Sequence, residues 1–375
     1  MRELISYIAP SAPATRRPAT GNEAPFRIEI GFTPNWYTER IGIDFGERWH
    51  TDPGYRKETV SAMLHELDIR FPGHNIGRMS DKPDLLTGVF GACSIAAVYG
   101  IPILFSKNNW PNCISKPLTD QEVEALKPPD LAHNPFFQGL MTQLDWIEKD
   151  QGQIQGFINW QGVLNNAHRL RGEQIFTDMF INPDSVLHLM SCVCSTMIEA
   201  AKKVCERQRR SNVEYQFFTI SNCLVNMISP EQYRDFVMPF DLKISQAFDS
   251  LGIHNCAWNA DPYTEYYARF PNLAYIDMGI KSDLEKAKKY FPKARRAVMY
   301  TPMDLDNKSM NQIKDDMYRI ALSYAPCDIV VADIEDGTSD YKIYGLFDIA
   351  NEINSKIEKG KLFPENTNEE KVYKK

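Results

Sequence analysis

The stretch Leu251-Gly252-Ile253-His254-Asn255-Cys256-Ala257-Trp258 is a short apolar run that ends on polar and aromatic residues. Three later apolar runs, which helical patterns separate, end in the same way at Asp277, Tyr300 and Asp333. Strands that alternate with helices form parallel sheets, and a (β/α)8 barrel carries its active site at the carboxyl ends of its strands. The pattern therefore predicts a single-domain α/β protein with the (β/α)8 (TIM) barrel fold and a site at these four chain positions.

The barrel is expected to span residues 26–360, between an irregular arm (1–25) and a flexible charged tail (361–375). Residues 26–32 alternate apolar and polar side chains as a strand does, and Asp52-Pro53 opens a helix that runs to about Arg70. Further strands are expected at residues 153–160 and 215–220. The proline-rich segment 107–135 is interpreted as a loop insertion that could act as a lid.

Composition excludes several classes of protein. The chain has 375 residues, of which 43% are hydrophobic and 24% charged, with a net charge of −7 and no long apolar or basic segment. It offers neither a membrane span nor a nucleic-acid face. No GxGxxG or P-loop pattern occurs. Eight scattered cysteines without a CxxC pair, and the lack of a secretory signal, favour reduced thiols and a cytoplasmic location.

Four motifs give the chain a family resemblance by their order. They are Ile30-Gly31-Phe32-Thr33-Pro34-Asn35-Trp36-Tyr37, Leu170-Arg171-Gly172-Glu173, Ile228-Ser229-Pro230-Glu231-Gln232-Tyr233 and Gly252-Ile253-His254-Asn255-Cys256. Over residues 25–360 the chain resembles the uroporphyrinogen decarboxylase superfamily, which includes the cobamide-dependent methyltransferases. The opening Gly-Phe-Thr-Pro and the run Asn159-Trp160-Gln161-Gly162 look most like the substrate-side methyltransferases of anaerobic aromatic O-demethylases.

The resemblance implies a zinc site. Its methyltransferase branch carries His-x-Cys and a much later Cys, and His254 and Cys256 match the first part. Ala257 stands where relatives usually have Gly. Cys327 begins an apolar run of about 20 Å, so it would lie at the barrel floor. We therefore expect Glu335 or Asp333, at the other end of that run and on one strand face, as the third ligand in place of Cys327.

Other strand-end residues are candidates for catalysis or substrate binding. Asp333, Glu335, Asp277 and Tyr300 are the candidate catalytic groups, because a carboxylate that closes an apolar strand is costly unless it is paired or used. Asn159, Trp160, Asn222, Asn226 and Trp258 are candidate substrate-binding residues, because strand-end aromatics can line a slot for an aromatic ligand. The alternative is structural: asparagines form turns, aromatics fill cores, and His-x-Cys can be a buried pair.

The resemblance implies transfer of a methyl group from a small methoxylated aromatic to the cobalt of a partner corrinoid protein. Three alternatives remain: methyl transfer from a methylcorrinoid to a thiol or folate, decarboxylation of a porphyrinogen-like substrate, and a non-catalytic binding barrel. The N-terminal arginine-rich motif of true porphyrinogen decarboxylases is missing; only Arg16-Arg17 lie near its place. The sequence leaves open whether the protein forms a homodimer.

Overall fold

The computed structural model describes residues 18–74, 81–114, 116–214 and 217–361. The first 17 residues of the expected arm and residues 362–375 of the expected tail lie outside this part. The strands are β1 (Phe26–Phe32), β2 (Ile103–Ser106), β3 (Asn109–Cys113), β4 (Phe217–Ser221), β5 (Ser250–His254), β6 (Leu273–Gly279), β7 (Arg295–Met299) and β8 (Cys327–Ile334).

Helices follow the strands in most of the chain. They are α1 (Pro34–Ile41), α2 (Glu47–Thr51), α3 (Pro53–Arg70), α4 (Ser94–Val98), α5 (Asp120–Glu124), α6 (Pro135–Gln151), α7 (Val163–Arg171), α8 (Gln174–Ile181), α9 (Pro183–Arg210), α10 (Pro230–Gln232), α11 (Met238–Ala247), α12 (Thr264–Tyr267), α13 (Leu284–Tyr290), α14 (Pro302–Asn307), α15 (Met310–Tyr324) and α16 (Asp340–Glu358). No described helix is long and apolar enough to cross a membrane.

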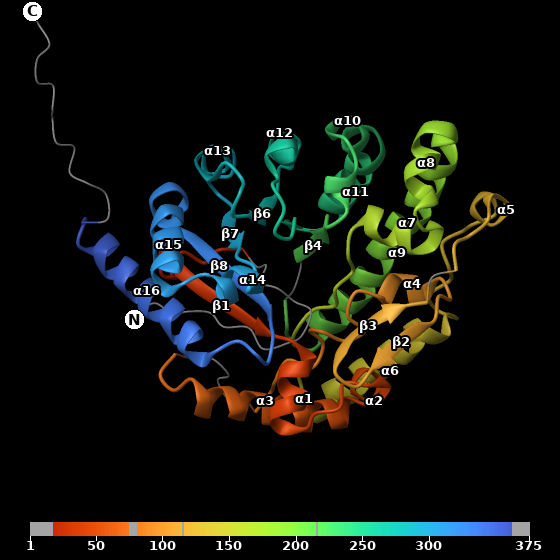
Figure 1. Ribbon diagram of the computed structural model, residues 1–375. Coiled ribbons are helices and arrows are strands. Elements are labelled where there is room, and N and C mark those ends of the chain that lie inside the picture. The colour runs from red at the N-terminus through yellow and green to blue at the C-terminus, as the bar shows by residue number, and fades with distance from the viewer. Residues whose placement is uncertain (1–17, 75–80, 115, 215–216, 362–375) are drawn as a thin grey trace, which may run out of the picture.

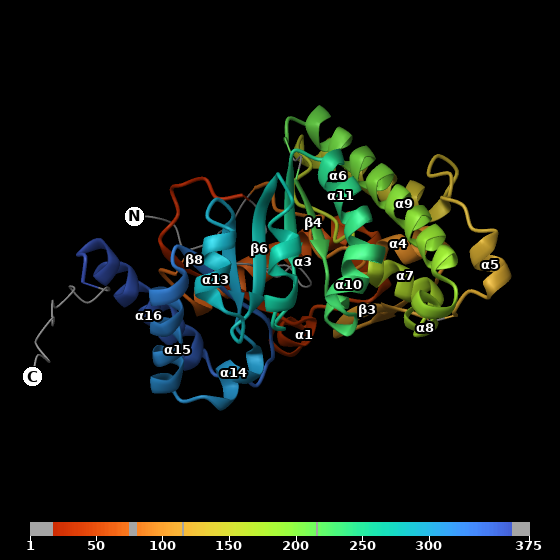
Figure 2. The same ribbon diagram turned by 90° about the horizontal axis from the view of Figure 1, so that it is seen from above.

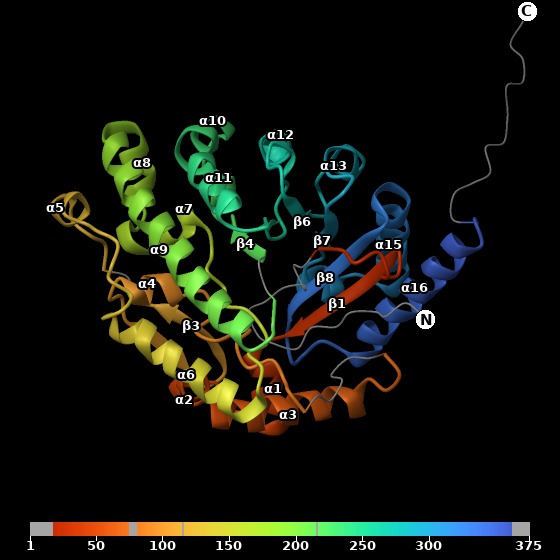
Figure 3. The same cartoon turned by 180° about the vertical axis from the view of Figure 1, so that it is seen from behind.

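Six strands form one parallel sheet in the order β1-β8-β7-β6-β5-β4. The helices lie outside it in an arc that runs from α16 through α13, α12 and α11 to α9, and α6 and α3 continue the arc (Figure 1). Seen from above, α15 and α16 lie side by side at one end of the molecule and α5 at the other (Figure 2). From behind, β1 lies beside β8, and α6 flanks α9 (Figure 3).

The sheet does not close into the expected eight-stranded barrel within the described residues. The segment 153–160, expected as a strand, is irregular. Side chains rather than a neighbouring strand satisfy its backbone: Ile154 N donates to Ser211 Oγ, and Gln208 Nε2 donates to the carbonyl oxygens of Ile154 and Gly156. Because β2 and β3 pair only with each other, as an antiparallel hairpin, they do not fill the gap either.

Two apolar regions hold the fold together. A large cluster packs the helices against the outer side of the strands. A second, smaller cluster on the inner side comprises Phe217, Tyr275, Ala297, Met299 and Val330. In the alternation of side chains along the strands, these residues face the same side of the sheet as Gly252. A Cβ added to Gly252 would lie 2.7 Å from the ring of Phe217. The inner face therefore leads toward His254, two residues beyond Gly252.

Candidate metal centre

Strand register brings two cysteines together at the carboxyl ends of β4 and β5. Ser221 of β4 pairs with His254 of β5, and Asn222 N donates to His254 O over 2.7 Å. Cys223 and Cys256 each lie two residues beyond this pair, so parallel pairing sets them side by side.

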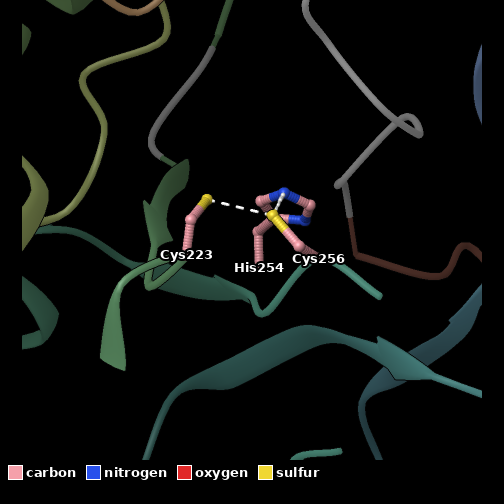
Figure 4. A group of neighbouring side chains, drawn as sticks. All are labelled: Cys223, His254 and Cys256. Carbon is pink, nitrogen blue, oxygen red and sulfur yellow. Dashed lines mark hydrogen bonds between the residues drawn. The ribbon is translucent and has the colours of Figure 1, made fainter. Parts of the chain in front are cut away.

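The side chains of Cys223, His254 and Cys256 converge on one point (Figure 4). Cys256 Sγ lies 3.1 Å from Cys223 Sγ and 3.1 Å from His254 Nε2. Cys256 reaches this position with a φ of 55°, in the left-handed region that non-glycine residues seldom adopt. Backbone strain of this kind persists where the surroundings enforce it and is concentrated at functional sites.

Asp277, at the carboxyl end of β6, fixes the orientation of His254. Its Oδ2 lies 2.7 Å from His254 Nδ1 and accepts from the Tyr275 hydroxyl over 2.9 Å, while Oδ1 accepts from Asn255 N over 2.7 Å. A histidine that donates Nδ1–H to a carboxylate presents Nε2 as an unprotonated ligand. Asp277, expected as a catalytic group, therefore stands behind the histidine as its positioning partner.

The three donors fit a zinc ion. Two cysteine sulfurs and one imidazole nitrogen are ligands that zinc prefers, and all three atoms lie within 4.8 Å of one another. Bonds of about 2.0–2.3 Å to one ion require donors at most about 4.6 Å apart, so a slight side-chain shift at most brings all three into contact with it. Three protein ligands leave the fourth tetrahedral position for a substrate, as catalytic zinc sites do.

The third ligand differs from the carboxylate expected from the sequence. The convergent group among the described residues contains Cys223 and neither Asp333 nor Glu335. Glu335 is exposed and accepts from Thr33 Oγ1 over 3.2 Å, at the end of β1. Cys327 is the first residue of β8 and is buried there, as its place in the sequence indicated. The correction is therefore from a carboxylate to Cys223.

A bulge in β8 explains why Asp333 and Glu335 do not share a face. Ile30 pairs with Val331 but Phe32 pairs with Ile334, so two β8 residues stand opposite one on β1. Asp333 is the second of these two and has a φ of 58°. A bulge re-aims side chains and breaks the alternation on which the sequence argument relied.

Asp333 lies in the mouth of the sheet, at its carboxyl edge. Its side chain is exposed to solvent, although many protein atoms surround it. Desolvation by these surrounding atoms raises the pKa of Asp333, against the lowering influence of a hydrogen bond from Trp110 and of the nearby His254. Trp110 Nε1 donates to Asp333 Oδ1 over 3.1 Å. Asp333 is therefore a carboxyl group at the mouth whose pKa lies above its usual value.

Tyr300, expected on the same rim, points the other way. Its hydroxyl donates to Asp316 Oδ2 of α15 over 3.0 Å, and its ring is buried in the outer apolar cluster. Lys308 Nζ lies 5.2 Å from the centre of that ring. Tyr300 follows the last residue of β7, Met299, which belongs to the inner cluster. Alternation thus turns Tyr300 outward, away from the rim on which the sequence placed it as a catalytic group.

The Asn-Trp-Gln-Gly run lies against the end of β4. A Cβ on Gly162 would lie 2.4 Å from Ser221 O, so only glycine permits this approach. Gln161, with a φ of 62°, donates from its backbone and side chain to Asn159 Oδ1. Trp160 is 8% exposed and lines a cavity of about 20 Å³ beside β4, too small for an aromatic substrate. The run therefore supports the rim next to Cys223.

Asn222 is buried on the helix side of β4, which contradicts its expected role in substrate binding. Its Nδ2 donates to Asp241 Oδ2 of α11 over 3.1 Å, and the Tyr233 hydroxyl donates to the same oxygen over 3.0 Å. Burial raises the pKa of Asp241 to about 7. Asn222 is one residue before Cys223, and the alternation of side chains sends it outward.

Two further substrate-binding candidates lie in loops at the rim. Asn226 is exposed in the 3-10 turn η1 (Val225–Met227), which follows Cys223. Trp258 is partly buried and packs edge-on against Tyr263 at 5.4 Å between ring centres. Tyr263 in turn donates to Val225 O over 3.0 Å. These contacts tie the loop after β5 to the loop after β4, so Trp258 stabilises the frame around Cys223 and Cys256.

Sequence reasoning missed two residues of this centre. Cys223 carried a usable signal, because it follows a strand by two residues as Cys256 does. Trp110 carried none, because it lies in the segment interpreted as a loop insertion and its partner Asp333 is 223 positions away in the sequence.

Comparisons with known proteins agree with this architecture. The family model for "Uroporphyrinogen decarboxylase (URO-D)" matches residues 80–317, more than half of the chain. A methyltransferase from Methanosarcina mazei has a similar fold with a TM-score of 0.61 and 15% identity, over 88% of this chain and 94% of that one. A B12-independent methionine synthase from Shewanella has a TM-score of 0.35 and 10% identity, over 69% and 75% of the two chains, which is too weak a likeness to carry an argument. No curated protein sequence matches.

Proposed function

The chain belongs to the uroporphyrinogen decarboxylase family, and from this premise we propose that it is a methyltransferase that takes a methyl group from a methoxylated aromatic and passes it to the cobalt of a partner corrinoid protein. The observation that supports this most is the pairing of a Cys223–His254–Cys256 metal centre with a carboxyl group, Asp333, near enough to His254 for their charges to interact.

Aryl methyl ethers resist cleavage because phenolate is a poor leaving group. In the proposed reaction, reduced cobalt attacks the methyl carbon with an electron pair and forms the carbon–cobalt bond. The methyl–oxygen bond breaks with its electrons on oxygen, and a proton neutralises the phenolate. Asp333, whose pKa is raised, is the group suited to hold and deliver that proton. A zinc ion held by Cys223, His254 and Cys256 would supply Lewis acidity to the site.

Decarboxylation of a porphyrinogen is less well supported by the position of the cations. Such substrates carry several carboxylates and need positive groups near the reacting carbon. The inner-face arginines Arg27 and Arg295 lie at the amino-terminal ends of β1 and β7. Both are paired there with Asp328, at the start of β8. They are thus at the opposite end of the strands from His254.

Methyl transfer from a methylcorrinoid to a thiol is the second candidate, and the donor set favours it. Two thiolates and a neutral imidazole leave a bound zinc ion with no net charge, which weakens its Lewis acidity. Such a site is suited to holding a substrate thiol as thiolate. The methyl carbon would then form a bond to sulfur, its bond to cobalt would break with the electrons on cobalt, and the thiol proton would be released.

One experiment separates the candidates. The zinc-loaded protein is mixed with a reduced corrinoid protein and a panel of methoxybenzenes, and with a methylated corrinoid protein and a panel of thiols, while the cobalt absorption spectrum is followed. Methylation of cobalt by a methoxybenzene, with release of the matching phenol, is the expected result. Demethylation by thiols alone would establish the second candidate. If the cobalt spectrum changes neither with the methoxybenzenes nor with the thiols, and carbon dioxide is released from a porphyrinogen, methyl transfer is refuted.

A further inference from the structure

The hairpin formed by β2 and β3 lies outside the parallel sheet but contacts Asp333 at the carboxyl end of β8. It contributes no strand to the parallel sheet, yet its residue Trp110 donates the indole N–H to Asp333 Oδ1 over 3.1 Å. The two residues are 223 positions apart in the sequence. The hairpin therefore ends beside a group that the proposed reaction needs.

The turn before Trp110 is held in place by α1 and its following loop. Phe45 N donates to Lys107 O over 2.8 Å, and Asn108 Nδ2 donates to Asn35 Oδ1 over 3.0 Å. Asn35 Nδ2 in turn donates to Asp336 Oδ1 over 2.9 Å, in the loop that follows β8. A chain of hydrogen bonds thus joins the hairpin turn to the residues directly after Asp333.

The residue after Trp110 is also fixed. Pro111 is buried and lies against Gly91, where a Cβ would lie 3.0 Å from the proline ring and where φ is 53°. Cys93 Sγ donates to Pro111 O over 3.5 Å. Because the chain is anchored on both sides of Trp110, the indole is held toward Asp333 by a supported element and not by a loose loop tip.

The Asp333 side of the contact is equally specific. The β8 bulge and the left-handed backbone of Asp333 turn its carboxyl group into the mouth. An indole N–H is a donor only, so Oδ1 must act as the acceptor. In the protonated acid this leaves Oδ2 as the oxygen that carries the proton. The indole thereby selects which oxygen can pass a proton to a bound substrate.

We propose that Trp110 is the positioning residue for Asp333 and that the β2–β3 hairpin is the element that completes the site. This inference rests on the proposed function where it concerns proton delivery. It assigns to the hairpin a role in the rate of the methyl step and not in metal binding. Trp110→Phe keeps an aromatic ring but removes the N–H donor, and so tests the positioning role directly.

A double-mutant cycle measures the coupling. We expect Trp110→Phe to lower kcat for cobalt methylation about tenfold with little change in KM, as the loss of one hydrogen bond to an ionisable group would. Asp333→Asn should lower kcat further, and the double variant should match Asp333→Asn alone, because Trp110 acts through Asp333. Trp146→Phe, on α6, is the matched control and should leave kcat unchanged. Additive effects of Trp110→Phe and Asp333→Asn would overturn the inference.

A second readout does not depend on the reaction. With indole-¹⁵N tryptophan, Trp110→Phe identifies the Trp110 signal among those of the six tryptophans. That N–H signal should shift as pH is varied and should lose this shift in Asp333→Asn. A Trp110 signal that is the same in both proteins would refute the positioning role. If the wild-type protein methylates no corrinoid but the Trp110 N–H signal shifts with pH only when Asp333 is present, the proposed function is wrong and the contact between Trp110 and Asp333 is confirmed.

Discussion

The two ends of the parallel sheet differ in how their ionisable side chains are arranged. At the amino-terminal end, Arg295 donates to Glu29 over 2.7 Å and to Asp328 over 2.6 Å, and Arg27 also pairs with Asp328. All four side chains are at most 4% exposed. We call this group the floor cluster. Cations and anions alternate in it, so its charges are compensated within the chain.

At the carboxyl end the ionisable groups are thiols and carboxyl groups grouped around one histidine. Cys223, Cys256, Asp277 and Asp333 would all be negative when ionised, and Asp277 forms its ion pair with His254. Cys256 and Asp333 also have left-handed backbones. Such a group is best compensated by a bound cation. The contrast indicates that the floor cluster stabilises the fold, while the carboxyl end of the sheet is suited to binding a cation.

Removal of Arg295 should have the largest effect on stability. Arg295→Met would remove the buried cation that pairs with both Glu29 and Asp328. We expect a loss of about 3–5 kcal/mol in the free energy of unfolding, measured by urea denaturation. Lys286→Met, which removes an exposed ion pair of 3.9 Å with Glu265, is the control and should cost less than about 1 kcal/mol. Equal losses would remove the distinction between the two ends.

Removal of a ligand at the other end should affect metal affinity instead. Cys223→Ser should weaken zinc binding more than about hundredfold, beyond the cost of losing an outer-shell partner, when measured by competition with a chelator. Cys327→Ser, at the start of β8, is the matched control and should bind zinc as the wild type does. Equal loss of zinc in both variants would contradict the assignment of Cys223 as the third ligand.

Loss of the partner behind the histidine should have a smaller effect on the same property. Asp277→Asn is nearly isosteric but removes the carboxylate that accepts from His254 Nδ1. Zinc affinity should fall about 10–100-fold. Asp241→Asn, which alters a buried carboxyl group on the helix side of β4, should leave zinc affinity unchanged and serves as the control. If Asp277→Asn binds zinc normally, His254 does not need this orientation or is not a ligand.

The sequence predicted the strands whose side chains alternate or form compact apolar runs, as at Phe26–Phe32 and Cys327–Ile334. It failed at residues 153–160, where apolar residues again suggest a strand. There Gly156, with a φ of 96° and packed against Asp84, interrupts the extended backbone. Side chains from α9 replace the partner strand. No local pattern reveals such long-range hydrogen bonds.

Two of the three ligands of the metal centre were predictable from the sequence. His254 and Cys256 are neighbours in sequence, and the end of a strand brings them together. The place of Cys223 beside Cys256 depends on the register of β4 against β5, and the direction of the Asp333 side chain depends on the position of a bulge in β8. The sequence alone specifies neither of these. Tyr300 was placed on the rim by counting to the strand end, although alternation with Met299 turns it outward.

The smallest effect is expected at Asp333, where it tests whether the raised pKa of this carboxyl group lowers the free energy of unfolding at neutral pH. Its pKa is raised in the folded protein, so ionisation opposes folding. Its contribution to stability is complete below the unfolded pKa and is lost as pH rises through the folded value. Without zinc, Asp333→Asn should match the wild type in stability near pH 4 and exceed it near pH 8 by about 0.5 kcal/mol, as expected for a side chain in contact with solvent. Asp235→Asn should show the opposite sign, because Arg234 lowers the pKa of Asp235, and the same sign in both variants would contradict the tuning of Asp333.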